Sequence, residues 1–140
     1  MKAVSVRFRV DLSAACAIGP GKVALLEAIA TSGSLSQAAR DLDMSYRRAW
    51  LLLAGLNASF RDPVVTLTKG GRGGGGAIVT AFGETLIAAY RGFEADVQRR
   101  ANAAFVTLSR SVRADTKDGE SVGRRPLKRR ETSAVRGTSG

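Results

Sequence analysis

The chain has 140 residues, enough for one modest domain with a single hydrophobic core. Its 22 lysines and arginines stand against 12 acidic residues, and the formal net charge of +10 favours polyanionic partners such as nucleic acids. With no histidine and a single cysteine, Cys16, the composition excludes an intrachain disulfide and the usual ligand set of a zinc site, and it fits a reducing cytoplasm.

The first twelve residues alternate between apolar and polar side chains. The apolar positions are Val4, Val6, Phe8 and Val10, and the polar positions between them are Ser5, Arg7 and Arg9. This period of two predicts a half-buried strand over residues 1–12, which pairs either within the fold or with a second subunit. Arg7 and Arg9 also interrupt any apolar signal-peptide core, and no apolar run approaches membrane-spanning length, so we expect neither feature.

Two helices are predicted after a break at Gly19-Pro20-Gly21. The first covers residues 22–30, where apolar residues recur at helical spacing. The second begins after Ser34 with a capping box: the Ser34 hydroxyl accepts from the amide N–H of Gln37, and the Gln37 side chain reaches back.

A third helix is predicted after a turn at residues 41–44, with Ser45 as its N-cap. Counting about 100° per residue gives a buried face of Ala49, Leu52, Leu53, Leu56 and Phe60. Tyr46 borders this buried face. The opposite side consists of Arg47, Arg48, Leu51 and Gly55, with Trp50 at its edge. Two helices joined by a tight turn, with arginines on the second, are typical of a helix-turn-helix, in which the second helix enters the major groove of DNA.

The outward face of the third helix carries most of the expected DNA contacts. Arg47 and Arg48 lie in its first turn, and the planar fork of arginine matches the two acceptors of guanine or the oxygens of a phosphate. Adjacent arginines on a solvated helix face are the alternative. Leu51 is expected to touch a thymine methyl group, while Tyr46 and Trp50 either join the core or contact sugar and phosphate. The expected contacts on the two helices are Ser36, Ser45, Tyr46, Arg47, Arg48, Trp50 and Leu51.

A β-hairpin is predicted from two short segments rich in β-branched residues, 64–68 and 77–80, and beside a helix-turn-helix such a hairpin is a wing. Lys69 and Arg72 in the glycine-rich tip are expected to contact a phosphate strand or the minor groove. The alternative is a flexible connection without a binding role. A nucleotide-binding loop is excluded, because no Gly-Lys-Ser/Thr follows at the required spacing.

Thr80 is expected to cap a final helix over about residues 81–109. Apolar residues spaced by three or four form a seam along it: Leu86, Tyr90, Phe93, Val97, Ala101, Ala104 and Leu108. A helix of this length extends about 40 Å, more than a small domain covers alone. We therefore expect a dimer contact along its exposed part, the alternative being an amphipathic helix packed on its own domain.

Residues 111–140 lose the apolar period and are rich in Lys, Arg, Gly, Ser and Thr. They predict a disordered basic tail, which leaves residues 1–110 as the DNA-binding domain. The predicted fold is mainly α with a small β component: a winged helix-turn-helix with an N-terminal strand and a long C-terminal dimerisation helix. We expect no enzyme activity, no metal and no cofactor, since no histidine is present and the carboxylates are scattered.

Three stretches carry a family resemblance: GSLSQAAR at 33–40, MSYRRAW at 44–50 and GGRGGGGA at 70–77. Through them the chain resembles the N-terminal winged-helix domain of the ModE family, the molybdate-responsive transcriptional regulators, and more distantly the LysR-type regulators. The resemblance implies a dimeric, sequence-specific binder of double-stranded DNA in the bacterial nucleoid, linked to molybdenum metabolism. It also implies dimerisation through the first strand and the last helix, where the expected contacts are Val6, Phe8, Tyr90, Phe93, Val97, Ala101 and Leu108.

The sequence departs from the full family pattern after the long helix. Two-part members continue there with a β-rich oxyanion-binding region, whereas this sequence continues with a short basic tail. That difference weighs against direct molybdate binding. Two other functions stay open: a nucleoid-type architectural DNA-binding protein of low sequence specificity, and a protein-interaction adaptor that uses the long helix.

Overall fold

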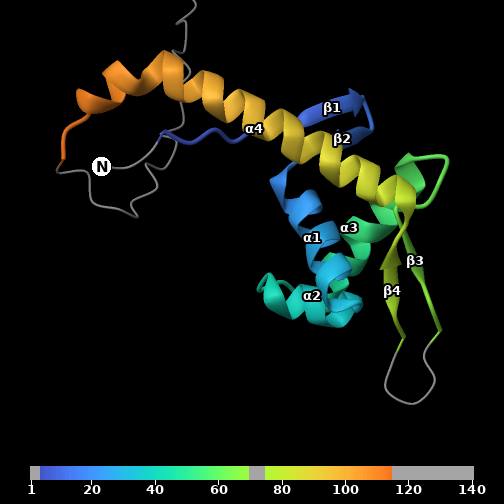
Figure 1. Cartoon of the computed structure of the whole chain (residues 1–140). Helices are drawn as coiled ribbons and strands as arrows, with labels where there is room; N and C mark the ends of the chain where they lie inside the picture. The colour runs from blue at the N-terminus through green and yellow to red at the C-terminus, as the bar shows by residue number, and fades with distance from the viewer. Residues whose placement is uncertain (1–3, 70–74, 115–140) are drawn as a thin grey trace, which may run out of the picture. The chain divides into compact units, whose positions relative to one another are not determined.

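The structure of the chain is a computed structural model that describes residues 4–69 and 75–114 (Figure 1). The chain divides into two units, Met1–Arg110 and Ser111–Gly140, and all the elements below belong to the first. Its described part consists of four helices and two antiparallel sheets of two strands each. The expected fold class, mainly α with a small β component and a long C-terminal helix, is confirmed.

α1 (Pro20–Ser32) lies at the centre of the first unit. It contacts α2 (Leu35–Asp41), α3 (Tyr46–Ser59), β4 (Ala77–Val79) and α4 (Ala81–Arg110). These many neighbours bury four of its side chains: Val23, Leu25, Leu26 and Ile29. α1 is longer at both ends than the predicted 22–30. It starts earlier because proline is tolerated in the first turn of a helix, where its missing N–H has no partner to lose, and it ends just before Gly33, which adopts a left-handed conformation.

The two predicted helices joined by a tight turn are confirmed in α2 and α3. Ser34 caps α2, and its Oγ accepts from the N–H of Gln37 at 3.2 Å. The second half of the expected capping box is wrong. The Gln37 side chain donates instead to Asp41, one turn further along α2, at 2.7 Å. In the turn Asp43 adopts a φ of 53°, a left-handed conformation that aspartate tolerates better than most residues.

The two short strands predicted for the wing are β3 (Val65–Leu67) and β4, which pair antiparallel with Val65 opposite Val79. Thr68 extends this pairing, because its N–H donates to the carbonyl of Gly76 and its hydroxyl accepts from the N–H of Gly76, both at 2.8 Å. Residues 70–74, and with them Arg72 of the predicted tip, lie outside the described residues.

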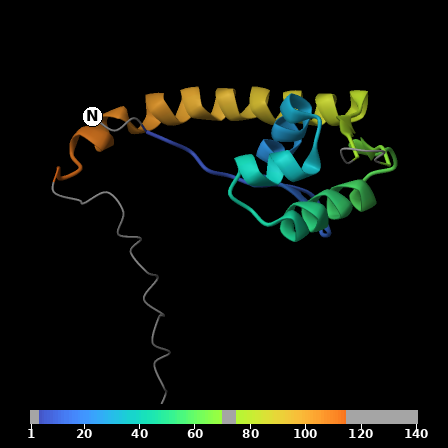
Figure 2. The ribbon, with the colours of Figure 1, turned by 90° about the horizontal axis from the view of Figure 1, so that it is seen from below.

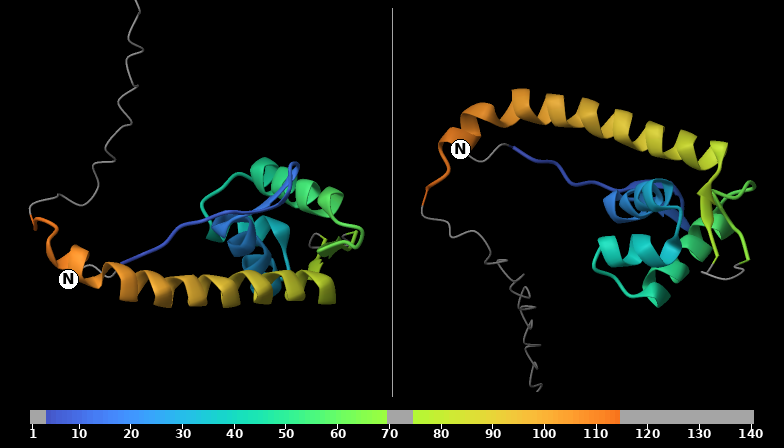
Figure 3. Two further views of the ribbon diagram at one scale, coloured as in Figure 1. Left: turned by 90° about the horizontal axis from the view of Figure 1, so that it is seen from above. Right: turned by 60° about the horizontal axis from the view of Figure 1, so that its bottom comes forward.

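The prediction of a single strand over residues 1–12 is wrong. Within the described residues 4–13, only β1 (Val10–Ser13) is a strand, and it pairs antiparallel with β2 (Cys16–Ile18), a strand that was not predicted. Residues 4–9 have no regular secondary structure and run beside α4 (Figures 2 and 3).

The alternation of apolar and polar residues over 4–9 nevertheless matches which side chains are buried and which are exposed. Val4, Val6 and Phe8 are half-buried, and the residues between them are exposed. An extended segment that lies along a helix buries every second side chain, just as a strand does. Gln98 of α4 supplies the hydrogen bonds that a strand would supply, since its carboxamide accepts from the N–H of Val6 at 3.3 Å and donates to the carbonyl of Val4.

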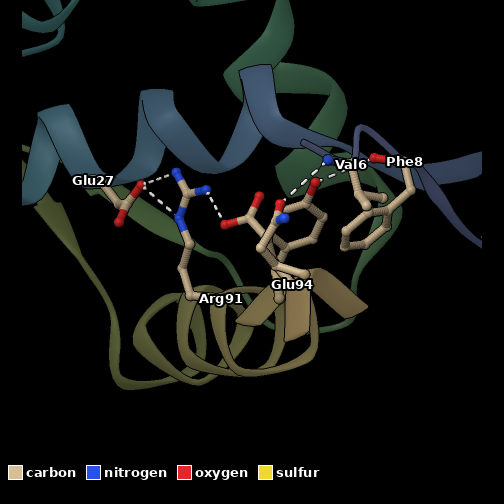
Figure 4. Close-up of polar contacts among 7 residues, drawn as sticks. Val6, Phe8, Glu27, Arg91 and Glu94 are labelled. Atoms are coloured by element: carbon tan, nitrogen blue, oxygen red, sulfur yellow. Dashed lines mark hydrogen bonds and ion pairs between the residues drawn. The ribbon is translucent and has the colours of Figure 1, made fainter. Parts of the chain in front are cut away.

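α4 starts at the predicted cap, where the Thr80 hydroxyl accepts from the N–H of Gly83 at 3.0 Å. Arg91 ties α4 to α1: its Nη2 lies 2.5 Å from Glu27 Oε1, and its Nη1 lies 2.7 Å from Glu94 Oε1 (Figure 4). The hydrogen bonds to Glu27 and then to Glu94 raise the pKa of the Arg91 guanidinium, so the arginine stays charged at any working pH.

Gly83 marks a very close approach between α4 and the segment before β3. A β-carbon built on Gly83 would lie 2.3 Å from the carbonyl oxygen of Val64 and 2.7 Å from Cγ1 of Val79. Only glycine permits this packing, because any side chain would push the start of α4 away from buried backbone.

We expect Gly83→Ala to lower the free energy of unfolding by about 1–3 kcal/mol, the usual range for overpacking. Gly92→Ala is the matched control on the same helix, since its β-carbon would meet no heavy atom within 4 Å. It should be neutral or stabilising by up to about 1 kcal/mol. Urea unfolding followed by circular dichroism measures both, and equal stability of the two variants would contradict the close approach.

Candidate nucleic-acid interface

α3 is built so that one side is buried and the other is free. Ser45 caps it as predicted, with its Oγ accepting from the N–H of Arg48 at 3.1 Å. The predicted inward face is confirmed: Ala49, Leu53 and Leu56 are buried, and Leu52 and Phe60 are partly buried against the same core. α1 lies between α3 and α4, so neither α1 nor α4 covers the outward side of α3 (Figures 2 and 3).

The outward side of α3 holds the two predicted arginines. Arg47 and Arg48 are exposed, and neither forms an ion pair with another described residue. The two arginines line a shallow hollow of about 340 Å³ together with Ser45, Leu51 and Leu52. Since Leu51 is 53% exposed, this hollow combines two free cations with an apolar contact. Such a surface matches the edge of a base pair, which presents both acceptors and, in thymine, a methyl group.

Tyr46 and Trp50 lie on the surface, so the alternative that they join the core is wrong. Tyr46 is 55% exposed and Trp50 is 47% exposed. They lie one helical turn apart, with Arg47 and Arg48 between them in the sequence. Two aromatic rings on a solvated face are unusual without a partner, and they provide flat surfaces for sugar or base contacts.

A small polar hollow brings α2, α3 and the wing together. It has a volume of about 130 Å³, and its lining consists of Leu35, Ser36, Tyr46, Leu67, Thr68, Gly75 and Gly76. Ser36 and Tyr46 were predicted as contacts from separate helices, and the structure places both at this one hollow. Thr68 and the two glycines were missed as site residues, since nothing in the sequence places the base of the wing beside α2. Lys69 follows Thr68 directly and is exposed.

The predicted dimer residues do not form one exposed seam. Phe8 from the N-terminal segment stacks on Tyr90, with ring centroids 5.2 Å apart, and meets Phe93 edge-on at 5.4 Å. The Tyr90 hydroxyl donates to the carbonyl of Phe8 at 3.2 Å (Figure 4). Burial, with a smaller effect of Glu94, raises the pKa of that hydroxyl, so it stays protonated and able to donate. The N-terminal segment therefore covers part of the apolar seam of α4, a contact that was not predicted.

Of the other predicted dimer residues, some are covered within the chain and two are mostly exposed. Val6 and Val97 are half-buried and Ala101 is buried, whereas Phe93 and Leu108 are more than half exposed. Next to Phe93 an apolar groove of about 240 Å³ opens between the β1–β2 hairpin and α4, and its lining consists of Val10, Leu12, Ile18, Leu86, Ala89, Tyr90 and Phe93. Leu12, Phe105 and Val112 are further exposed apolar residues that the sequence analysis missed.

Within residues 4–69 and 75–114, no helix is both long and apolar enough to cross a membrane. The same residues contain no group of three or more Cys, Asp or Glu side chains placed to hold a metal ion.

Similar proteins exist for part of the chain. The molybdenum-pterin-binding protein MopB of Rhodobacter capsulatus is 48% identical over 82 residues, which cover 59% of this chain and 30% of MopB. The DNA-binding transcriptional dual regulator ModE of Escherichia coli K12 is 42% identical over 71 residues, or 51% of this chain and 27% of that protein. The molybdenum transport protein ModE of Azotobacter vinelandii is 35% identical over 92 residues, or 66% and 34%.

No protein-family model matches the chain. The chain spans about a third of the length of the curated relatives it matches. Over about half of its own length it is nevertheless similar to proteins named Mop and ModE, as a ModE-like N-terminal domain would be. The resemblance to ModE found in the sequence motifs is therefore confirmed.

We expect Ser45→Ala to lower the free energy of unfolding by about 1 kcal/mol, because the N–H of Arg48 loses its capping acceptor. Ser59→Ala at the other end of α3 is the control. Its hydroxyl donates only to the Gly55 carbonyl one turn back, a bond that adds little to helix stability. Thermal unfolding without DNA measures both, and a loss no larger than that of the control would contradict the capping role of Ser45.

Proposed function

We propose that this chain is a dimeric, sequence-specific DNA-binding transcriptional regulator. The observation that carries the proposal is the outward side of α3, where two arginines without a described acidic partner lie beside exposed Leu51, Tyr46 and Trp50. This helix is the second of a helix-turn-helix, and a hairpin follows it. Such a helix enters the major groove while the wing lies along the flanking backbone.

The contacts divide by their chemistry. Arg47 and Arg48 donate to the acceptors of guanine or to phosphates, and Leu51 touches a thymine methyl group. Tyr46 and Ser36 share the polar hollow, whose hydroxyl groups suit a backbone phosphate. The remaining contacts hold the backbone on either side: Ser45 and Trp50 from α3, and Lys69 and Arg72 from the wing.

The second copy occupies the apolar groove between the β1–β2 hairpin and α4. Phe93 and Leu12 border this groove and are 52% and 56% exposed. Burying them against the same surface of a partner removes apolar area from water, as in a two-fold symmetric interface. The second half of α4, with Phe105 and Leu108 exposed, extends the contact.

A link to molybdenum is proposed from the relatives. Their names describe molybdenum-pterin binding, molybdenum transport and DNA-binding transcriptional regulation. We propose that this chain regulates genes of molybdenum use, and that it acts on the chromosome in the bacterial cytoplasm.

Replacing Arg47 or Arg48 tests whether the outward side of α3 contacts the bases. Arg47→Ala and Arg48→Ala should each weaken binding to a selected duplex by about 1–3 kcal/mol, which is roughly 5- to 150-fold in Kd, without loss of fold. Arg99→Ala is the control, since it removes the same charge from α4, where Arg99 pairs with Asp96. Fluorescence anisotropy at fixed salt measures Kd.

Three results would contradict the proposal in different ways. Unchanged affinity in both arginine variants would show that another face contacts DNA. Equal affinity of the wild type for random and selected duplexes would favour an architectural DNA-binding protein. Absence of duplex binding at low salt would favour a protein-interaction adaptor.

A pair of leucine variants separates the two surfaces. Leu12→Asp places a charge in the apolar groove and should convert the dimer to monomer, because burying an unpaired carboxylate is strongly unfavourable. Leu51→Asp makes the same change at a residue of similar exposure, 53% against 56%, and should leave the dimer intact while weakening DNA binding. Light scattering after size exclusion gives the mass. A dimer that survives Leu12→Asp would rule out this groove as the interface.

A further inference from the structure

One side chain of α3 is bonded to the backbone that begins the wing. The Asn57 Oδ1 accepts from the N–H of Val64 at 2.8 Å and from the N–H of Val65 at 3.4 Å. Its Nδ2 donates to the carbonyl of Val65 at 3.1 Å. Asn57 therefore serves three backbone groups of two buried residues, and it does so from the helix that carries Arg47 and Arg48.

The other side of the same backbone is held by the start of α4. The Val64 carbonyl accepts from the N–H of Thr80 at 3.0 Å, and the Pro63 carbonyl accepts from the Thr80 hydroxyl at 2.6 Å. Gly83 packs directly against the Val64 carbonyl. The base of β3 is thus fixed to α4 through Thr80 and Gly83, and to α3 through Asn57.

Asparagine suits this position because its amide both accepts and donates at short reach. An aspartate would keep the two accepted bonds and lose the donor, and an aliphatic residue would leave three buried backbone groups to find other partners. Beyond this point β4 bonds to the end of α1, where the Ala77 N–H donates to the Gly33 carbonyl at 2.9 Å. Of these wing-base bonds, the Asn57 bonds are those that come from α3.

We propose that Asn57 is a positioning residue, which sets the wing relative to α3 so that both contact the same DNA duplex. The proposal rests on the proposed DNA-binding function. When Asn57 is lost, the base-reading side of α3 stays intact, while Lys69 and the rest of the wing no longer meet the phosphates beside the half-site. Asn57 itself touches no DNA.

The salt dependence of binding tests this proposal directly. Each phosphate contact made by a cation adds about one to the slope of log Kd against log salt concentration. Asn57 is neutral, so its replacement changes the slope only if cations elsewhere leave the DNA. The probe is a duplex selected by the wild type from a random-sequence pool, and the variants are Asn57→Ala, Lys69→Ala and the double variant.

We expect Lys69→Ala to lower the slope by about one, and Asn57→Ala to lower it by at least as much. Adding Lys69→Ala to Asn57→Ala should then have little further effect, because the wing has already left the backbone. Asn102→Ala is the matched control on α4, where the Asn102 carboxamide accepts only from Gln98, and its slope should equal that of the wild type. If Asn57→Ala does not fold, Asn57→Gln keeps a neutral amide at the wrong length and should give the same lowered slope.

The outcomes separate the two proposals. A wild type that binds the selected duplex, with an unchanged slope in the folded Asn57 variant or with fully additive effects of Asn57→Ala and Lys69→Ala, would overturn the positioning role alone. A wild type that selects no duplex would overturn the proposed sequence-specific DNA-binding function itself.

Discussion

The structure depends on how the buried backbone at Val64 satisfies its hydrogen bonds. Val64 is fully buried, so its N–H and carbonyl need partners inside the protein. Asn57 of α3 accepts from the N–H, and the N–H of Thr80 at the start of α4 donates to the carbonyl. Gly83 has no side chain that would clash with this carbonyl. The base of the wing, α3 and the start of α4 therefore meet at this one buried segment.

From this point the chain builds two surfaces out of different elements. α2, α3 and the base of the wing share a surface with exposed arginines, exposed aromatic rings and a polar hollow. The β1–β2 hairpin and α4 share an apolar groove. Arg91 joins α4 to α1 through Glu27, and α1 in turn packs on both helices of the helix-turn-helix. We propose that DNA binds the first surface and that a second copy of the chain binds the apolar groove.

The sequence predicted what local rules determine. Ser34, Ser45 and Thr80 cap the helices that follow them, and helical spacing identified the buried and outward sides of α3. It failed where the partner of a segment lies far away. Residues 4–9 alternate like a strand but lie on α4, and Cys16–Ile18 was too short to be recognised as the partner of β1. Asn57 was missed because it bonds to backbone, which leaves no signature in residue types. Whether Tyr46 and Trp50 are exposed could not be predicted, because it depends on how α2 and α3 pack.

The most direct measurement is selection of duplexes from a random-sequence pool by the purified chain, followed by hydroxyl-radical footprinting of the selected DNA. We expect an enriched inverted repeat, with half-site centres about 10 base pairs or a multiple of that apart, because a two-fold dimer presents two copies of α3 to one face of the duplex. We also expect backbone protection on both sides of each half-site, where the wing and the polar hollow lie. A pool that stays random while the chain binds it, or enrichment that persists unchanged when Arg47 and Arg48 are both replaced by alanine, would contradict the claim that α3 reads the sequence.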